Sequence, residues 1–227
     1  MIKLINRLPY ISAPRIELIR IICTFNAYPD LALFWEQDDV RALICMLDNN
    51  MVIYNNGADI GELKSFINMI SPACVFSDAD TLSALFGDGY ERVQVSGREC
   101  EGHFFPSDKP SSREVYDILN TAGLFLPDYE HFAVDYCHRI NRGLADCFYI
   151  KDKCAAITFK ADDYCILNGI SSHKKGMGRV ALEAIMEINR GRYMLCCHRD
   201  NVKDFYKKCG FKPLYTAGYW RKHSELF

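Results

Sequence analysis

A short loop that contains two glycines, between a strand-like and a helix-like segment, is the feature that most restricts the folds open to this chain. The loop is Ser171-Ser172-His173-Lys174-Lys175-Gly176-Met177-Gly178, and it follows the run Tyr164 to Ile170. Apolar residues then recur with helical spacing at Met177, Val180, Ala181, Ala184, Ile185 and Ile188. Such a loop lets the backbone approach a ligand, and the helix start attracts phosphate. A tight turn with solvated lysines explains an isolated GxG equally well.

The segments around this loop predict the order ααβββαβαβ for the C-terminal half. Ser111 or Ser112 can cap a helix that runs to about Thr121, and Asp128 a second helix that runs to Asn141. Three strand-like runs with short charged turns predict antiparallel hairpins over Asp146 to Ile150, Ala155 to Lys160 and Tyr164 to Ile170. After the helix that follows the glycine loop come a strand, a short helix and a last strand, at Tyr193 to Cys197, Val202 to Lys208 and from Phe211 onward.

The two halves of the 227-residue sequence differ in charge. Residues 1–105 contain 8 Lys and Arg against 14 Asp and Glu, whereas residues 106–227 contain 19 against 15. An anionic ligand should therefore prefer the C-terminal half. Between the halves, the segment Phe105-Pro106-Ser107-Asp108-Lys109-Pro110-Ser111-Ser112 has the composition of a linker or helix entry. We therefore expect two domains, 1–105 and 106–227.

A second motif begins 23 residues beyond Gly178 and reads Asn201-Val202-Lys203-Asp204-Phe205-Tyr206-Lys207-Lys208-Cys209-Gly210-Phe211. In this order and element context, the two motifs resemble those of the GNAT acetyltransferase superfamily. The family's acetyl-CoA signature is Gln or Arg, two residues, Gly, one residue, then Gly or Ala, and its later signature is Asn…Phe-Tyr…Gly-Phe. The resemblance spans roughly residues 111–220.

The resemblance implies acetyl-CoA (coenzyme A) as co-substrate. Its pyrophosphate would lie on the loop 173–178, and its pantetheine between two splayed strands, 164–170 and 193–197, where it pairs as an added strand does. Two features depart from the family pattern, since His173 replaces Gln or Arg and only six residues separate Gly169 from Gly176. We therefore expect the loop to bind the phosphate more weakly, or through a different set of contacts. The coenzyme-binding residues that we expect are Gly169, Ile170, Ser171, His173, Lys174, Lys175, Gly176, Met177, Gly178, Arg179, Asn201 and Tyr206.

The N-terminal half reads as a degenerate copy of the same unit. A shift of 120 residues aligns 75–86 with 195–206, with matching apolar positions and with Asp80 opposite Asp200. Strand-like runs and a helix precede this segment in the same order, at Leu31 to Trp35, Arg41 to Leu47, Met51 to Tyr54 and Gly61 to Ile70. We therefore predict an α/β (α+β) fold of two tandem GNAT-like units, each a mixed, mostly antiparallel sheet flanked by helices.

The N-terminal unit lacks the coenzyme motifs. The segment Asn55-Asn56-Gly57-Ala58-Asp59-Ile60 has one glycine and no lysine, and Phe86 stands in place of the motif tyrosine. We expect this unit to bind no coenzyme, and to pack on the other unit or form part of the acceptor pocket. Its Asp38-Asp39 pair suits a solvated hairpin turn better than a site for a cationic substrate.

The function that the resemblance implies is direct transfer of an acetyl group from acetyl-CoA to an amine of a small molecule or peptide. A backbone N–H near Gly169 to Ser171 can meet the developing oxyanion. In the family the tyrosine of Phe-Tyr reaches the coenzyme sulfur, which makes Tyr206 the expected catalytic acid; a core tyrosine is the alternative. Asn201 should bond coenzyme amides, unless it is a plain helix N-cap. No base is identified among the candidates near the expected cleft, which are Asp163, Asn168, His198, Cys196 and Cys197.

Two other functions are weighed against this one. Gly176-Met177-Gly178-Arg179-Val180-Ala181 fits the GxGxxA fingerprint of a Rossmann dehydrogenase, but hairpins instead of a βαβ unit precede it, so the context fails. A non-catalytic acyl-CoA sensor or scaffold that keeps the fold is the remaining alternative.

Composition excludes several classes of protein. Hydrophobic residues make up 49% and charged residues 25%, as in soluble globular domains. We expect no membrane association, because no apolar run is long enough and charges and prolines interrupt residues 1–25. The 11 cysteines form no CxxC, so we expect no metal site. Most of them lie in apolar strand-like runs, which predicts reduced thiols and a cytoplasmic location. The sequence has no basic stripe interleaved with exposed aromatic residues, so it gives no indication of nucleic-acid binding.

Overall fold

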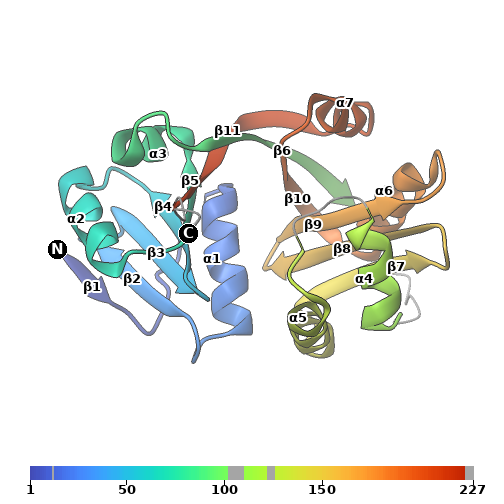
Figure 1. Ribbon diagram of the computed structural model, residues 1–227, viewed down its shortest axis with the longest axis horizontal. Coiled ribbons are helices and arrows are strands. Elements are labelled where there is room, and N and C mark those ends of the chain that lie inside the picture. Colours follow the sequence, from blue (N-terminus) through green and yellow to red (C-terminus); the bar gives the residue numbers. More distant parts are fainter. Residues whose placement is uncertain (12, 102–109, 122–125, 223–227) are drawn as a thin grey trace, which may run out of the picture. The chain divides into compact units, whose positions relative to one another are not determined.

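The computed structural model describes residues 1–11, 13–101, 110–121 and 126–222 (Figure 1). Residue contacts divide the chain into two compact units. The first comprises Met1–Ser96, Cys196–Tyr206 and Pro213–Phe227, and the second comprises Gly97–Leu195 and Lys207–Lys212. The first unit therefore includes two segments of the C-terminal half. Residues 105–109 of the expected linker lie outside the described part, and the division of the sequence into repeats at 105/106 stays a prediction.

The first unit is built on a mixed sheet with the strand order β1-β2-β3-β4-β5-β11-β6. Neighbours β1 to β4 pair antiparallel in turn, β4 and β5 pair parallel, and β5 pairs antiparallel with β11. The strands are β1 (Ile2–Leu4), β2 (Leu33–Gln37), β3 (Ala42–Leu47), β4 (Asn50–Asn55), β5 (Cys74–Asp78), β6 (Glu91–Glu101) and β11 (Lys212–Arg221). The helices are α1 (Ile16–Ala27), α2 (Ile60–Ile70) and α3 (Ala79–Phe86).

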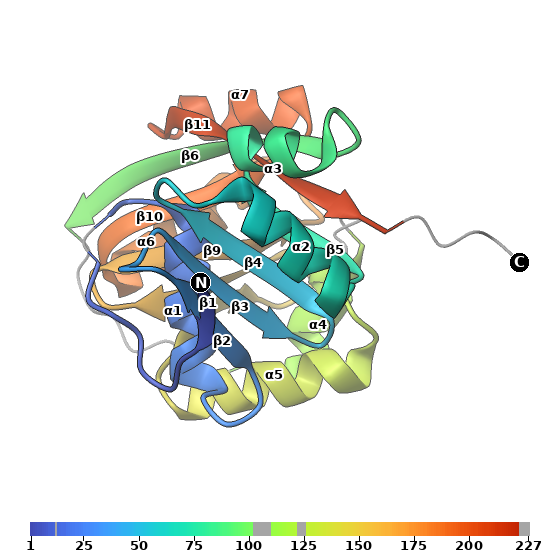
Figure 2. The ribbon, with the colours of Figure 1, turned by 90° about the vertical axis from the view of Figure 1, so that its left-hand side faces the viewer.

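Helices cover both faces of this sheet, because its strands are apolar on both sides. Figure 2 shows α2 on the near face of the sheet and α1 behind it. On the α1 face the core is formed by Leu18, Ile21, Ala32, Phe34, Leu43, Cys45 and Tyr54. On the α2 and α3 face it is formed by Trp35, Ala42, Ile44, Met51, Ile53, Leu63, Phe66, Ile67, Val75, Leu82 and Leu85.

The second unit has the strand order β6-β10-β9-β8-β7, so that β6 contributes to both units. Helices α4 and α5 pack on β7, β8 and β9, with a core of Val115, Ile118, Leu119, Phe132, Tyr136, Cys147, Ala155 and Ile157, and α6 also packs on these strands. The elements are α4 (Ser112–Asn120), α5 (Tyr129–Asn141), β7 (Ala145–Ile150), β8 (Cys154–Ala161), β9 (Tyr164–Ser172), α6 (Met177–Ile188) and β10 (Arg190–Cys197), followed by α7 (Asp200–Lys208).

The predicted element order and fold class are confirmed. The C-terminal half follows α4-α5-β7-β8-β9-α6-β10-α7-β11, the predicted ααβββαβαβ order. Ser111 caps α4 in a capping box with Glu114, and Asp128 accepts from the His131 N–H over 3.1 Å at the start of α5. The structure adds β1, α1 and β6, for which no element was predicted.

A buried carboxylate links α1 to β11 within the first unit. The Tyr215 hydroxyl donates to Glu17 Oε2 over 2.8 Å and accepts from the Ile16 N–H over 2.8 Å. Glu17 is 0% exposed, and its Oε1 has no partner in the described part of the chain. Burial raises the pKa of Glu17 above its ordinary 4.5, although the Arg15 guanidinium, 3.4 Å from Oε2, acts in the opposite direction.

This raised pKa predicts a pH dependence of stability. Because the folded protein holds the proton more tightly, the contribution of Glu17 is full below about pH 4.5 and is lost as pH rises through the raised pKa. We expect the unfolding free energy of the wild type to fall relative to that of Glu17→Gln over this window. Denaturation of both forms at several pH values measures the difference, with the exposed Glu130→Gln as control. A difference that stays constant with pH would contradict the assignment.

Candidate functional site

The central feature of the second unit is the point at which β9 and β10 separate. The two strands pair in parallel at Tyr164–Arg192, Cys165–Tyr193 and Ile166–Met194. Their described residues form no further pair beyond Ile166, although β9 continues to Ser172 and β10 continues past Met194. Backbone groups that leave a ladder must find other partners. This opening can therefore accept an extended ligand, and the position of pantetheine there, which the family resemblance implies, stays a prediction.

A β-bulge lies on β9 just beyond the last pair with β10. On the β8 side, Gly169 pairs with Ile157 and Leu167 with Thr158, which leaves Asn168 as the extra, exposed residue. A bulge bends the strand and frees backbone groups locally. Gly169 itself is buried, and a Cβ there would lie 3.4 Å from Ile157 Cγ2 and 3.5 Å from Leu119 Cδ2. The glycine thus allows close packing between the bulged strand and α4.

The glycine loop leads from the end of β9 into α6, as predicted. Gly176 is the N-cap residue, with a φ of 88° and no side chain that caps the helix. Met177 N donates to the Lys174 carbonyl over 3.1 Å and Arg179 N to the Gly176 carbonyl over 3.2 Å. The N–H groups of Gly176 and Gly178 have no acceptor among the described residues. These free donors, at the positive end of a helix dipole beside exposed Lys174 and Lys175, suit an anion.

His173 is fixed at the side of this loop. Its backbone N–H donates to the Lys153 carbonyl over 2.8 Å, and its ring Nε2 lies 2.8 Å from Thr121 Oγ1 at the end of α4. The imidazole is exposed. The residue that departs from the family pattern therefore joins the loop to α4, which gives it a structural role whether or not it also contacts a phosphate.

The equivalent opening in the first unit is bridged by the chain's own side chains. Strands β4 and β5 also pair in parallel at three positions, the last being Val52–Phe76. Beyond this pair, the buried Ser77 hydroxyl donates to the Ile53 carbonyl over 2.8 Å. The Asn55 side-chain amide donates to the Thr81 hydroxyl over 2.8 Å. The backbone that faces the opening is therefore already partly satisfied without a ligand.

The start of α2 is likewise capped from within. Asn55 Oδ1 accepts from the N–H groups of Gly57 and Ala58 over 3.0 and 2.8 Å. Asp59 caps the helix by accepting from Glu62 N over 3.1 Å. Side-chain oxygens thus accept from N–H groups before and within the first turn of α2, whereas no side chain caps α6. The N-terminal half, which lacks the glycine loop, thus caps the start of its helix with its own side chains.

The two predicted residues of the second motif lie in α7 and belong to the first unit. Tyr206 is buried, with 6% of its surface exposed, and its ring contacts Phe205 edge-on at 5.1 Å. Asn201 is exposed and lies in the first turn of α7, which begins at Asp200. Because it is inside the helix, the N-cap explanation for Asn201 is wrong. The roles of both residues toward a coenzyme stay predictions.

Among the possible bases, His198 has the most suitable partner. Its Nδ1 lies 2.7 Å from Glu91 Oε1, an arrangement that fixes an imidazole tautomer. Burial raises the pKa of Cys197 to about 12 and also raises that of Cys196, so both thiols are protonated at neutral pH. The partner Glu91 was missed by sequence reasoning because it lies in β6, far from His198 along the chain.

Among the residues that the structure describes, no group of three or more His, Cys, Asp or Glu could hold a metal ion. In the same part of the chain, no helix has the length and apolar character needed to cross a membrane.

Several solved structures with a similar fold are GNAT proteins. A GCN5-related N-acetyltransferase from Kribbella flavida matches with a TM-score of 0.56 at 13% identity, over 82% of this chain and 88% of that one. A GNAT-family acetyltransferase from Colwellia psychrerythraea matches with a TM-score of 0.51 at 13% identity, over 98% and 100%. A tandem GNAT protein from the clavulanic acid biosynthesis pathway matches with a TM-score of 0.51 at 11% identity, over 94% and 89%.

Comparison at the level of sequence gives no match, either to a protein-family model or to a curated protein. Identities near one in ten establish fold and not substrate. Together with the separating strands and the element order, the structural matches show that this chain has the fold of the GNAT acetyltransferases, as two tandem GNAT-like units.

Proposed function

We propose that the protein is a GNAT-type N-acetyltransferase that binds acetyl-CoA along β9 and the start of α6 and acetylates an amine. The observation that carries this proposal is that one strand, β9, bears three features of such a site. It separates from β10 after Ile166, it bulges at Asn168, and it ends at the uncapped start of α6. A long ligand with an anionic group at one end and amides along its length fits all three.

The coenzyme would lie along this strand. Its pyrophosphate would accept from the free N–H groups of Gly176 and Gly178, with Lys174 and Lys175 adding positive charge. Its pantetheine amides would pair with the backbone that β10 leaves open. The contacts that we propose come from Gly169, Ile170, Ser171, His173, Lys174, Lys175, Gly176, Met177, Gly178 and Arg179, with Asn201 and Tyr206 added by the family resemblance.

In the reaction that we propose, the neutral amine attacks the thioester carbonyl, so that a C–N bond forms and the C–S bond breaks. A backbone N–H between Gly169 and Ser171, next to the bulge, stabilises the negative charge on the carbonyl oxygen. Tyr206 gives a proton to the departing thiolate, in keeping with the family resemblance, and the proton that the attacking nitrogen loses returns through water to the Tyr206 phenolate. The acceptor is an amine of a small molecule or a peptide.

A non-catalytic acyl-CoA sensor is the second candidate, and two observations favour it. Tyr206 is buried like a core residue, and His173 is engaged with Thr121. Either function fits a cytoplasmic protein, which we propose because all 11 cysteines are free thiols.

The first test of the proposed function concerns ligand binding. Acetyl-CoA should stabilise the protein by about 2.7 kcal/mol at a hundredfold excess over its dissociation constant, and NAD should not. Thermal-shift or denaturation curves with each ligand test this. The double variant Lys174→Gln, Lys175→Gln should bind acetyl-CoA more weakly, since it lacks the charge beside α6. Its matched control is Lys151→Gln, Lys153→Gln in the exposed β7–β8 turn. Stabilisation by NAD alone would refute the proposal.

The second test separates enzyme from sensor. If Tyr206 protonates the thiolate, Tyr206→Phe lowers kcat by roughly 10² to 10⁴ and leaves coenzyme affinity nearly unchanged. Tyr54→Phe is the matched control, because Tyr54 is also 6% exposed. Calorimetric affinity for acetyl-CoA and an acetylation rate are measured on the same preparations.

Two outcomes would count against this assignment. Unchanged kcat in Tyr206→Phe would remove Tyr206 as the acid. Tight acetyl-CoA binding by the wild type without acetyl transfer to any member of a broad amine panel would favour the sensor.

A further inference from the structure

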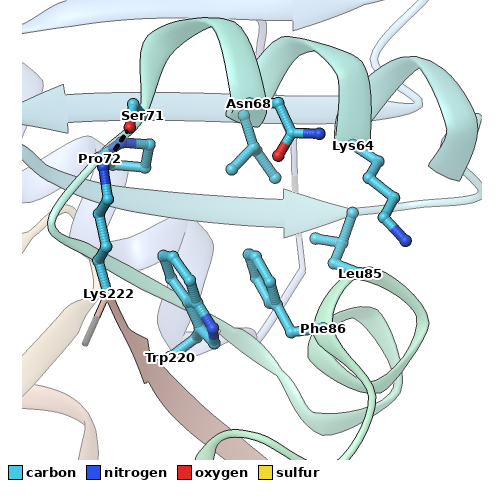
Figure 3. A pocket seen from close by; sticks show the side chains of 9 residues that line it. Lys64, Asn68, Ser71, Pro72, Leu85, Phe86, Trp220 and Lys222 are labelled. Atoms are coloured by element: carbon cyan, nitrogen blue, oxygen red, sulfur yellow. Dashed lines mark hydrogen bonds between the residues drawn. The ribbon is translucent and has the colours of Figure 1, made fainter. Parts of the chain in front are cut away.

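The first unit contains a cavity of about 260 Å³ between α2, the end of α3 and the end of β11. Its apolar wall includes Leu85 and two parallel rings, Phe86 and Trp220, which stack with centroids 4.3 Å apart and planes 7° apart (Figure 3). Aromatic walls of this kind favour flat apolar groups. The cavity shares no lining residue with the coenzyme-binding residues proposed above.

The polar groups at this cavity are cationic or neutral. Lys64 and Asn68 project from α2, and Lys222 lies at the opposite end from Lys64 (Figure 3). No Asp or Glu is among the described residues that line it. A ligand with an apolar body and a negative charge is therefore complementary to the cavity, whereas a cation is repelled.

Lys222 is held at this position by two hydrogen bonds to the chain that follows α2. Its ammonium donates to Ser71 Oγ over 2.8 Å, and its backbone N–H donates to the Ala73 carbonyl over 2.9 Å. Ser71 ends α2 in the left-handed region at a φ of 54°, a conformation that costs a non-glycine residue free energy. Lys222 also lies at the C-terminal, negative end of the α2 dipole, which partly compensates its positive charge. We therefore expect Lys64 to contribute more than Lys222 to the binding of an anionic ligand.

We propose that this cavity is a second binding site, which takes a small carboxylate with a flat apolar body. The ring system lies against Phe86 and Trp220, and the carboxylate faces Lys64, with Asn68 and Lys222 as further donors. The site is distinct from the coenzyme site and does not depend on the acetyltransferase proposal.

The test compares three ligands of the same shape and different charge. Phenylbutyrate, phenylbutyramide and phenylbutylamine are titrated into the full chain by calorimetry. We expect the carboxylate to bind about fivefold tighter than the amide, as exposed charge pairs allow, and the amine to bind weakest. Equal affinity for all three, or no binding of phenylbutyrate, would overturn the proposal.

Variants then locate the binding. Lys64→Gln should weaken phenylbutyrate about threefold and Lys222→Gln less, and the double variant should bind the carboxylate and the amide equally. Asn68→Phe, at an exposed position over the cavity, should block all three ligands without disturbing the core. The charge control is Lys151→Gln in the second unit. Phenylbutyrate binding that survives Asn68→Phe and the double lysine variant would place the ligand elsewhere and refute the site.

Discussion

The structure depends on how the backbone groups of two parallel strands are hydrogen-bonded where the strands separate after three pairs. Every backbone N–H and C=O that leaves the ladder needs another partner. The chain meets this requirement in two ways. Between β4 and β5 the hydroxyl of Ser77 bonds across the gap to the Ile53 carbonyl. Between β9 and β10 no such bond follows Ile166 in the described residues, and the backbone there is left to water or a ligand.

The helix that follows the separating strand repeats this contrast. Asn55 and Asp59 give oxygens to the N–H groups before and within the first turn of α2. At α6 the corresponding position is Gly176, which has no side chain to offer and a φ of 88° that suits glycine. In the first unit, side chains of the protein itself thus accept hydrogen bonds at the helix start. In the second unit, the N–H groups of Gly176 and Gly178 have no acceptor among the described residues. A few side chains on a shared framework are enough to make this difference.

Local patterns in the sequence predicted those structural features that depend on interactions between neighbouring residues. The caps Ser111 and Asp128, the hairpins from β7 to β9 and the glycine loop are all encoded within a few neighbouring residues, and all are confirmed. The sequence shift that aligned 75–86 with 195–206 also found real counterparts, since each segment is a strand followed by a helix.

Pairings between distant parts of the chain were beyond that reasoning. Residues Ala217 to Arg221 of β11 pair with Asp78 to Cys74 of β5, which places the end of the chain in the first unit. No periodic pattern of apolar residues in the sequence predicts such a strand pairing. The same holds for His198 with Glu91 and for Tyr215 with Glu17, whose members come from separate elements. The partner that singles out His198 among the candidate bases therefore emerges only from the folded chain.

The two ways of satisfying the separated strands have different consequences for stability. Bonds such as Ser77 to Ile53 form whenever the first unit folds, so they contribute to its stability under all conditions. In the second unit the equivalent contacts within the protein would come from the proposed ligand, and their contribution would rise with ligand concentration. A region whose backbone bonds are incomplete opens locally at lower free energy. The opening that we propose for the coenzyme is thus a place of lower intrinsic stability, which ligand binding would raise.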